Sequence, residues 1–115
     1  MSSSSSFPLP SSASEPTIIQ EGPFCGEARP WGNFLVLRDE PHYKLKQLQV
    51  SPGHRLSLQK HQHREEHWLV TRGTPHITVG DKTWMAQPGE YIHIPKEALH
   101  RLANLGTDVV EMIEV

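Results

Sequence analysis

The chain lacks most of the features that mark secreted, membrane and nucleic-acid-binding proteins. It has one cysteine, Cys25, so no disulfide can form within it. No apolar run approaches the roughly 18 residues that a membrane-spanning helix needs, and the N-terminus has neither the basic region nor the apolar core of a secretory signal. A net charge of −2 gives no basic surface for nucleic acid or anionic lipid. We therefore expect a cytoplasmic protein with neither nucleic acid nor membrane among its partners.

The first 28 residues are short of charge and of large apolar side chains. They contain eight serines and four prolines, and their only charged side chains are three glutamates. Such a segment buries too little apolar surface to offset the entropy lost on ordering. We expect residues 1–28 to be largely disordered, with residues 17–28 available as an arm that packs through Ile18 and Ile19. Residues 29–115 are long enough for one domain with one modest core.

The remainder of the chain has the pattern of many short β-strands. Apolar and polar residues alternate in short runs between turn signals, and no run has helical caps with a sustained 3.6-residue period. Gly80-Asp81 separates two such runs and predicts a two-residue hairpin turn. The pattern indicates an all-β, single-domain protein, either a small antiparallel barrel or a sandwich. The expected strands are residues 33–37, 43–50, 55–61, 66–71, 76–79, 82–86, 91–94, 100–104 and 109–115.

Metal-ligating residue types gather in the stretch SLQKHQHREEHWLV, residues 57–70. On a strand, Gln59, His61 and His63 share one face. A hairpin after His63 would bring either Glu66 or His67 back beside His61, but not both, because neighbours on a strand point to opposite faces. A further ligand should come from a distant strand, and His100 is the best candidate because Pro95 lets the chain turn back before it.

The spacing in this stretch resembles the first sequence motif of the cupins, G-x5-H-x-H-x3-4-E-x6-G. Five residues separate Gly53 from Gln59, four separate His61 from Glu66, and six separate Glu66 from Gly73. The fit requires Gln59 in place of the first histidine. Placing His61 and His63 on the two histidine positions instead breaks all three spacings, so we prefer the first alignment.

The second cupin motif, G-x5-P-x-G-x2-H-x3-N, is matched by Gly89, Pro95, His100 and Asn104, with Glu97 in place of the middle glycine. The resemblance implies a small antiparallel jelly-roll barrel. It also implies that one divalent metal ion is bound. Zinc is the first expectation, and Mn, Fe, Ni and Co also suit such ligands. The predicted ligands are Gln59, His61, Glu66 and His100.

Longer stretches resemble one branch of this superfamily. RPWGNFLVL and SPGHRLSLQKHQHREEHWLVTRGT are similar to the isomerase region of bifunctional mannose-1-phosphate guanylyltransferase/mannose-6-phosphate isomerases, over about residues 29–115. The resemblance implies an enzyme that interconverts mannose 6-phosphate and fructose 6-phosphate. A different metal-dependent cupin enzyme, such as an oxygenase, and a sugar-binding cupin without turnover are the alternatives.

An isomerase of this kind needs a base and a phosphate-binding group. His63, His54 or a metal-bound hydroxide could remove the sugar proton. Arg55 or Arg101 could hold the phosphate, because the planar guanidinium matches phosphate oxygens. A regular strand would turn the side chain of Arg101 away from that of His100.

Two expectations concern the outer faces of the strands. His67 should point away from Glu66. If Gln59 faces inward, Leu56 and Leu58 should face outward and need a cover. We therefore expect a homodimer in which the arm of residues 17–28 can cross to the second copy.

Overall fold

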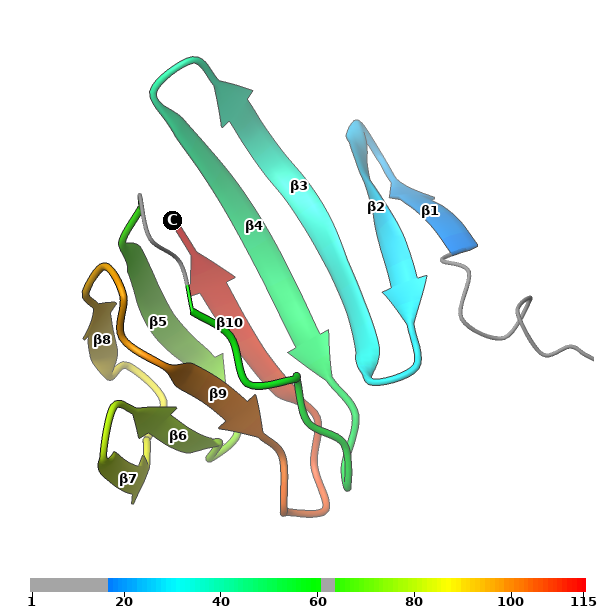
Figure 1. The fold of residues 1–115 in the computed structure, drawn as a ribbon. Helices are drawn as coiled ribbons and strands as arrows, with labels where there is room; N and C mark the ends of the chain where they lie inside the picture. Colours follow the sequence, from blue (N-terminus) through cyan, green and yellow to red (C-terminus); the bar gives the residue numbers. More distant parts are fainter. Residues whose placement is uncertain (1–16, 61–63) are drawn as a thin grey trace, which may run out of the picture.

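The computed structural model describes residues 17–60 and 64–115. The expectation of disorder for residues 1–16 and the expectations for His61 and His63 lie outside these ranges. Within them the chain forms strands and no helix, so no helix that could cross a membrane occurs there. Figure 1 labels the strands, which are β1 (Thr17–Glu21), β2 (Phe24–Arg29), β3 (Gly32–Glu40), β4 (Tyr43–Val50), β5 (Glu66–Arg72), β6 (His76–Val79), β7 (Lys82–Met85), β8 (Tyr91–Ile94), β9 (His100–Ala103) and β10 (Val110–Glu114).

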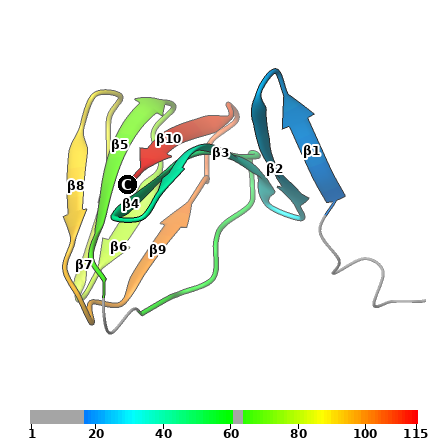
Figure 2. The same ribbon diagram turned by 90° about the horizontal axis from the view of Figure 1, so that it is seen from above.

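The strands form two antiparallel sheets, which confirms the predicted all-β class. The large sheet has the order β1-β2-β3-β4-β10-β5-β8, and the small sheet has the order β7-β6-β9. Figure 2 shows the small sheet lying across from β5 and β10, with residues 51–60 running along the open side between β9 and the large sheet. These residues join the small sheet at only two bridges, Arg55 to Ala103 and Gln59 to His100.

The core lies between the two sheets and follows the alternation of the strands. Val110 and Met112 on β10 are buried, as are Trp68 and Val70 on the neighbouring β5. Leu102 of the small sheet closes the core from the other side. Burial of such side chains stabilises the fold by about 1.5–3 kcal/mol each. The same alternation places Glu66 inside with Trp68 and leaves His67 on the outer side of β5.

Most expected strands are present, and β4, β6 and β8 begin and end at the predicted residues. The hairpin turn at Gly80-Asp81 is confirmed, because Val79 pairs with Lys82 across it. The strand expected at residues 55–61 is wrong for its described part, residues 55–60. This segment makes isolated bridges to β9 because its register shifts by one residue between them, since four positions separate Arg55 from Gln59 and three separate Ala103 from His100.

The predicted outward face of residues 55–60 is correct for Leu58 and wrong for Leu56. Leu58 is 45% exposed, whereas Leu56 is half-buried and packs against the core. Leaving the regular pleat frees the segment from strict alternation, so Leu56 turns inward although Gln59, which stays exposed, also lines the cavity between the sheets.

Residues 17–29 form a hairpin that extends the large sheet. β1 pairs with β2 along its whole length, and β2 pairs with β3. Gly26 allows the close approach of β2 to β3, because a Cβ atom at this position would lie 1.8 Å from the carbonyl oxygen of Phe34. The hairpin lies at the edge of the molecule opposite β8 (Figure 2).

Glu97 occupies the glycine position of the second motif, and its backbone keeps the conformation that favours glycine. Its φ of 67° lies in the left-handed region, which costs a residue with a Cβ atom roughly 1–2 kcal/mol. We expect Glu97→Gly to raise the free energy of unfolding by about 0.5–1 kcal/mol, after the larger chain entropy of glycine is subtracted. Urea denaturation measures the change. Lys96→Gly is the matched control, and an equal effect of both substitutions would contradict this explanation.

Candidate functional site

A cavity of about 550 Å³ opens between the two sheets, and three predicted metal ligands line it. Gln59 comes from the bridging segment, Glu66 from the start of β5 and His100 from the start of β9. Gln59 and His100 are joined through their backbones by two hydrogen bonds of 2.9 Å. The fold thus brings residues 41 positions apart in the sequence to one wall. The fourth predicted ligand, His61, lies outside the described residues.

Glu66 and His100 face each other at the buried end of the cavity. Oε2 of Glu66 lies 3.6 Å from Nε2 of His100. The indole Nε1 of Trp68 donates a hydrogen bond of 3.0 Å to Oε1 of Glu66. On the far side of its ring, Nδ1 of His100 donates to the carbonyl oxygen of Ala98 over 3.0 Å. Trp68 and the Ala98 carbonyl therefore hold the two side chains so that Oε2 of Glu66 and Nε2 of His100 point toward each other.

The two facing groups shift each other's proton affinity. Burial alone would raise the pKa of Glu66, but hydrogen bonds from His100, Glu114 and Trp68 outweigh it and lower the pKa to about 2. Burial alone would lower the pKa of His100, but its hydrogen bonds to Glu66 and to the Ala98 carbonyl raise it. Without a metal, the site therefore favours a carboxylate facing an imidazolium.

These groups fit a divalent ion. Adjacent ligands at 2.0–2.2 Å from a tetrahedral ion lie about 3.4 Å apart, close to the 3.6 Å between Glu66 Oε2 and His100 Nε2. Nδ1 of His100 donates its hydrogen to a carbonyl oxygen, so Nε2 is the nitrogen that would bind a metal. A hydrogen bond of this kind commonly orients metal-ligating histidines. Gln59 adds an amide to the same wall. The described part of the predicted ligand set is thus compatible with a bound ion.

Glu114 on β10 is a cavity residue that the motifs did not reveal. Burial and the neighbouring carboxylate of Glu66 raise the pKa of Glu114 to about 7. At neutral pH, one proton is therefore held by this pair of carboxyl groups in a fraction of the molecules. The alternation along β10 could have indicated this position, because Glu114 falls on the same face as the apolar residues Val110 and Met112.

The raised pKa of Glu114 predicts that the free energy of unfolding decreases as pH rises. Between about pH 4.5 and pH 7, folded Glu114 keeps a proton that the unfolded chain loses, so the free energy of unfolding decreases with pH. The raised pKa of His100 acts in the same direction above about pH 6.5, in wild type and in Glu114→Gln alike, and the lowered pKa of Glu66 acts mainly below about pH 5. With metal removed by EDTA, we expect wild type to lose about 2–3 kcal/mol more than Glu114→Gln between pH 5 and pH 8. Urea denaturation at both pH values measures this, and parallel pH profiles would contradict it.

Basic side chains outnumber carboxyl groups around the cavity. Five basic residues and two glutamates line it within the described residues, the basic ones being Arg29, Lys46, Arg55, Arg64 and Arg101. Arg55 and Arg101 were predicted from the sequence. Arg101 lines the cavity beside His100, although a regular strand was expected to turn it away. Its Nε atom is buried and makes no hydrogen bond with any residue in the described ranges. The wall therefore suits an anionic ligand.

The remaining predicted residues that the structure describes do not line this cavity. His54 is exposed in the turn before Arg55 and is not among the residues that line the cavity. His63 lies outside the described residues. His67 faces away from Glu66, as expected, and lies with Glu65 and His93 on the outer surface, where one ligand atom from each lies within 4.8 Å of the others. This second group is also compatible with a metal ion.

The sequence has relatives among known proteins, each matched over a part of its length. The chain is 43% identical over 91 residues to the alginate biosynthesis protein AlgA of Pseudomonas aeruginosa, covering 79% of this chain and 19% of the relative. It is 45% identical over 87 residues to mannose-1-phosphate guanylyltransferase 2 of Escherichia coli O157:H7, covering 76% and 18%. The chain thus spans less than a fifth of the length of these relatives.

The fold is shared with solved cupin structures. A cupin-2 domain from Rhodospirillum rubrum superimposes with a TM-score of 0.69 at 20% identity, over 87% of this chain and 66% of that one. This likeness confirms the predicted cupin fold. Residues 23–115 match the family described as "Mannose-6-phosphate isomerase C-terminal", which covers every described strand except β1. The chain therefore belongs to the mannose-6-phosphate isomerase C-terminal family and has a cupin fold.

Proposed function

We propose that this chain is a metal-dependent sugar-phosphate isomerase that interconverts mannose 6-phosphate and fructose 6-phosphate. The observation that carries the proposal is the cavity itself, in which Gln59, Glu66 and His100 line one wall beside an excess of basic side chains. The first group suits a divalent ion and the second suits a phosphate. Membership of the family supports the choice of sugar.

The metal would be held by Gln59, Glu66 and His100, with His61 as the further predicted ligand. Zinc is our first choice among the divalent ions that accept amide, carboxylate and imidazole ligands. When bound, such an ion polarises the carbonyl and hydroxyl oxygens of a sugar. Trp68 and the Ala98 carbonyl hold Glu66 and His100 in place, as their hydrogen bonds show.

The other cavity residues would bind the phosphate and move the proton. Arg101 offers a buried Nε with no described partner, and Arg55 lies on the same wall. A base must take the proton from the carbon next to the carbonyl. By position, Glu114 is the cavity carboxyl not assigned to the metal, and His63 keeps its predicted role as an alternative. The exposed position of His54 outside the cavity makes it the weakest of the three candidates.

A coupled assay tests the function with the full chain. Fructose 6-phosphate formed from mannose 6-phosphate is measured after EDTA treatment and after Zn²⁺, Mn²⁺, Co²⁺ or Ni²⁺ is added back. We expect turnover that requires metal and is lost in His100→Gln but kept in His76→Gln, a matched control on β6. Sugar-phosphate binding without turnover would replace the proposal by a binding role, and metal-dependent oxygen consumption would replace it by an oxygenase.

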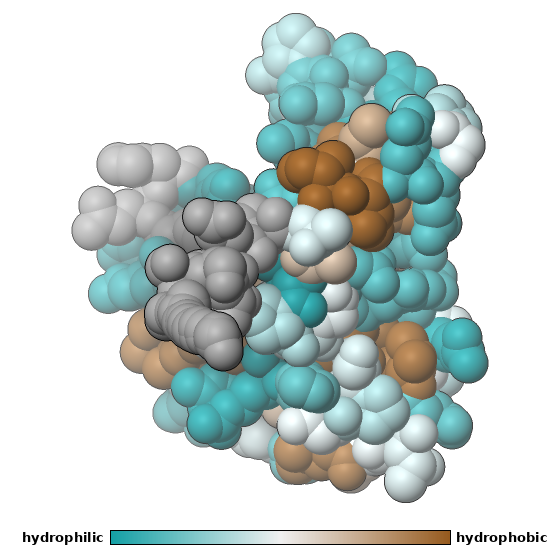
Figure 3. Space-filling model, turned by 90° about the vertical axis from the view of Figure 1, so that its right-hand side faces the viewer, coloured by the Kyte–Doolittle hydropathy of each residue, from teal (hydrophilic) through white to brown (hydrophobic). Residues whose placement is uncertain are grey.

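We also propose that the working form is a homodimer built through the β1–β2 hairpin. β1 is an open sheet edge, and its Ile18 is 71% exposed. Figure 3 shows apolar side chains gathered on the β1 side of the molecule, with hydrophilic ones around them. A second copy of the same edge can cover such a strip and pair with it. Light scattering should give twice the 13.0 kDa chain mass for wild type and the single mass for Ile18→Glu. A monomeric wild type contradicts the proposal.

A further inference from the structure

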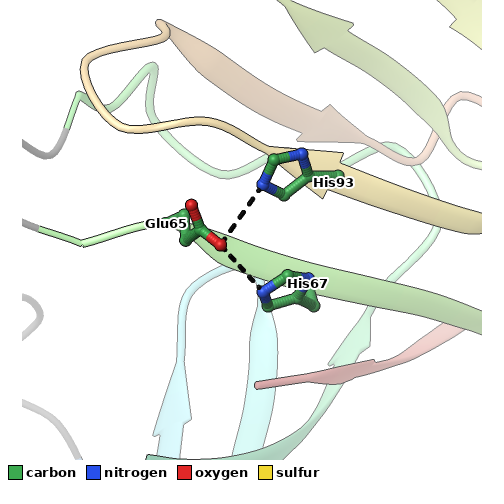
Figure 4. A group of neighbouring side chains, drawn as sticks. All are labelled: Glu65, His67 and His93. Carbon is green, nitrogen blue, oxygen red and sulfur yellow. Dashed lines mark ion pairs between the residues drawn. The ribbon is translucent and has the colours of Figure 1, made fainter.

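Glu65, His67 and His93 form a compact group on the outer surface of the large sheet, on the other side of β5 from the cavity. His67 on β5 pairs in register with His93 on β8, so their rings project from the same face. Glu65 immediately precedes β5 and turns its carboxylate between them, as Figure 4 shows. The alternation of the chain places Glu66 inside and its two neighbours in this outer group.

The two distances from the Glu65 carboxylate match those around a tetrahedral ion, and all three ligand atoms lie within 4.8 Å of one another. Oε1 of Glu65 lies 3.4 Å from Nε2 of His67 and 3.5 Å from Nε2 of His93. Ligand atoms at 2.0–2.1 Å from a tetrahedral zinc ion lie about 3.4 Å from one another. The two rings are stacked with centroids 5.2 Å apart. Two imidazoles and one carboxylate also form a ligand set that zinc uses elsewhere with its fourth position open to water.

Tyr91 gives the group a supporting contact. Its hydroxyl lies 2.6 Å from Nδ1 of His67, and the two rings stack. If Nδ1 donates its hydrogen to Tyr91, the lone pair of Nε2 is directed at Glu65. Metal-ligating histidines are oriented in this way by a hydrogen bond to their second nitrogen. A simple ion pair between Glu65 and a protonated histidine needs neither the second ring nor this orientation.

We propose that Glu65, His67 and His93 bind a second divalent transition-metal ion, of the zinc class, separate from the ion expected in the cavity. β8 is a four-residue strand at the edge of the large sheet and pairs only with β5 there. An ion held by residues from both strands would stabilise this edge of the sheet, because a molecule or ion that binds only the folded form stabilises that form. The outer site would thus stabilise the fold, and the proposal does not depend on the isomerase reaction.

Cobalt titration of the metal-free full chain tests the proposal. Co²⁺ replaces zinc and its visible absorption reports tetrahedral coordination, while calorimetry gives the stoichiometry. We expect two ions per chain for wild type, one for His93→Gln, one for His100→Gln and none for the double variant. His76→Gln is the matched control and should bind two. Zn²⁺ should raise the melting temperature of His100→Gln and leave that of His93→Gln,His100→Gln unchanged.

The outcomes separate the two sites. If wild type binds one ion that His93→Gln keeps and His100→Gln loses, the outer site is overturned and the cavity site stands. If the one ion is lost in His93→Gln and kept in His100→Gln, the outer site stands and the cavity site fails. The exposed position of His93 should let its variant fold, and circular dichroism checks this. Glu65→Gln provides a second route to the same answer.

Tyr91→Phe tests the positioning contact. Loss of a hydrogen bond to a metal-ligating histidine typically weakens metal binding about 10–100-fold. We expect a decrease of this size in the affinity for cobalt at the outer site, with a changed visible spectrum and an unchanged stoichiometry. An unchanged affinity and spectrum would overturn the positioning role of Tyr91.

Discussion

Replacing Glu66 with glutamine is expected to lower kcat/KM for mannose 6-phosphate about a thousandfold and to remove the metal from the cavity. Glu66 is the only carboxylate among the predicted ligands, and it is buried at the inner end of the cavity. The expected loss corresponds to about 4 kcal/mol of transition-state stabilisation, which is within what a metal ion contributes by polarising an oxygen. Glutamine keeps the size of the side chain and can still accept the hydrogen bond from Trp68.

The coupled isomerase assay and the metal content of the purified variant measure this effect together. Glu21→Gln is the control, since Glu21 is exposed at the end of β1, far along the sheet from β5. Glu66→Gln that kept both its metal and its activity would show that the carboxylate is not a ligand. A variant that kept the metal but lost activity would move the role of Glu66 from binding the ion to contacting the substrate.

The strands that were predicted correctly are those whose local pattern and partners agree. β4, β6 and β8 alternate between turn signals and pair along their whole length, so local information was sufficient. Residues 55–60 have the same alternation, but their register with β9 shifts by one residue between the two bridges, which a local pattern cannot reveal. Conversely, residues 17–29 lack a clear alternation and become strands because β3 provides a free edge.

The same distinction holds for the site. Motif spacing was enough to bring Gln59, Glu66 and His100 to one cavity, because Glu66 and His100 begin strands and Gln59 is bridged to His100. Lys46 and Glu114 come from neighbouring strands outside the motifs, and only the pairing of β4 with β10 brings them to the cavity. The outer group likewise needs the register of His67 with His93, which depends on how β5 and β8 meet.

Asn104, the last residue of the second motif, is expected to be the most important polar side chain for stability. It is 1% exposed. Its Nδ2 donates to the carbonyl oxygens of Val50 and Asp108, both over 2.8 Å, and its Oδ1 accepts from the amide of Gly106 over 3.1 Å. Removing the side chain leaves the carbonyl oxygen of buried Val50 without this donor, at about 1–3 kcal/mol for a buried group. Gly106 and Asp108 are exposed and can turn to water instead. We expect Asn104→Ala to lower the free energy of unfolding by about 2–3 kcal/mol.

Urea denaturation of the metal-free chain measures the loss. Asn33→Ala is the matched control, because Asn33 is half-buried and makes one long side-chain hydrogen bond of 3.3 Å to Gln49. Its expected cost is about 1 kcal/mol or less. Equal costs for the two substitutions would show that the three contacts of Asn104 do not carry its effect.

Asn104→Asp separates the donors from the acceptor. The carboxylate can still accept from Gly106, but it faces the carbonyl oxygens of Val50 and Asp108 without a hydrogen to donate. We therefore expect it to be at least as destabilising as alanine at pH 7, and a fully stable aspartate variant would contradict the role of the donors. The backbone of Asn104 also bonds to His54 and Gly53. Any residue at position 104 can keep these backbone bonds, but only the asparagine side chain donates to the carbonyl of Val50, just before the segment that carries Gln59. Asn104→Ala should therefore weaken metal binding in the cavity without removing any ligand.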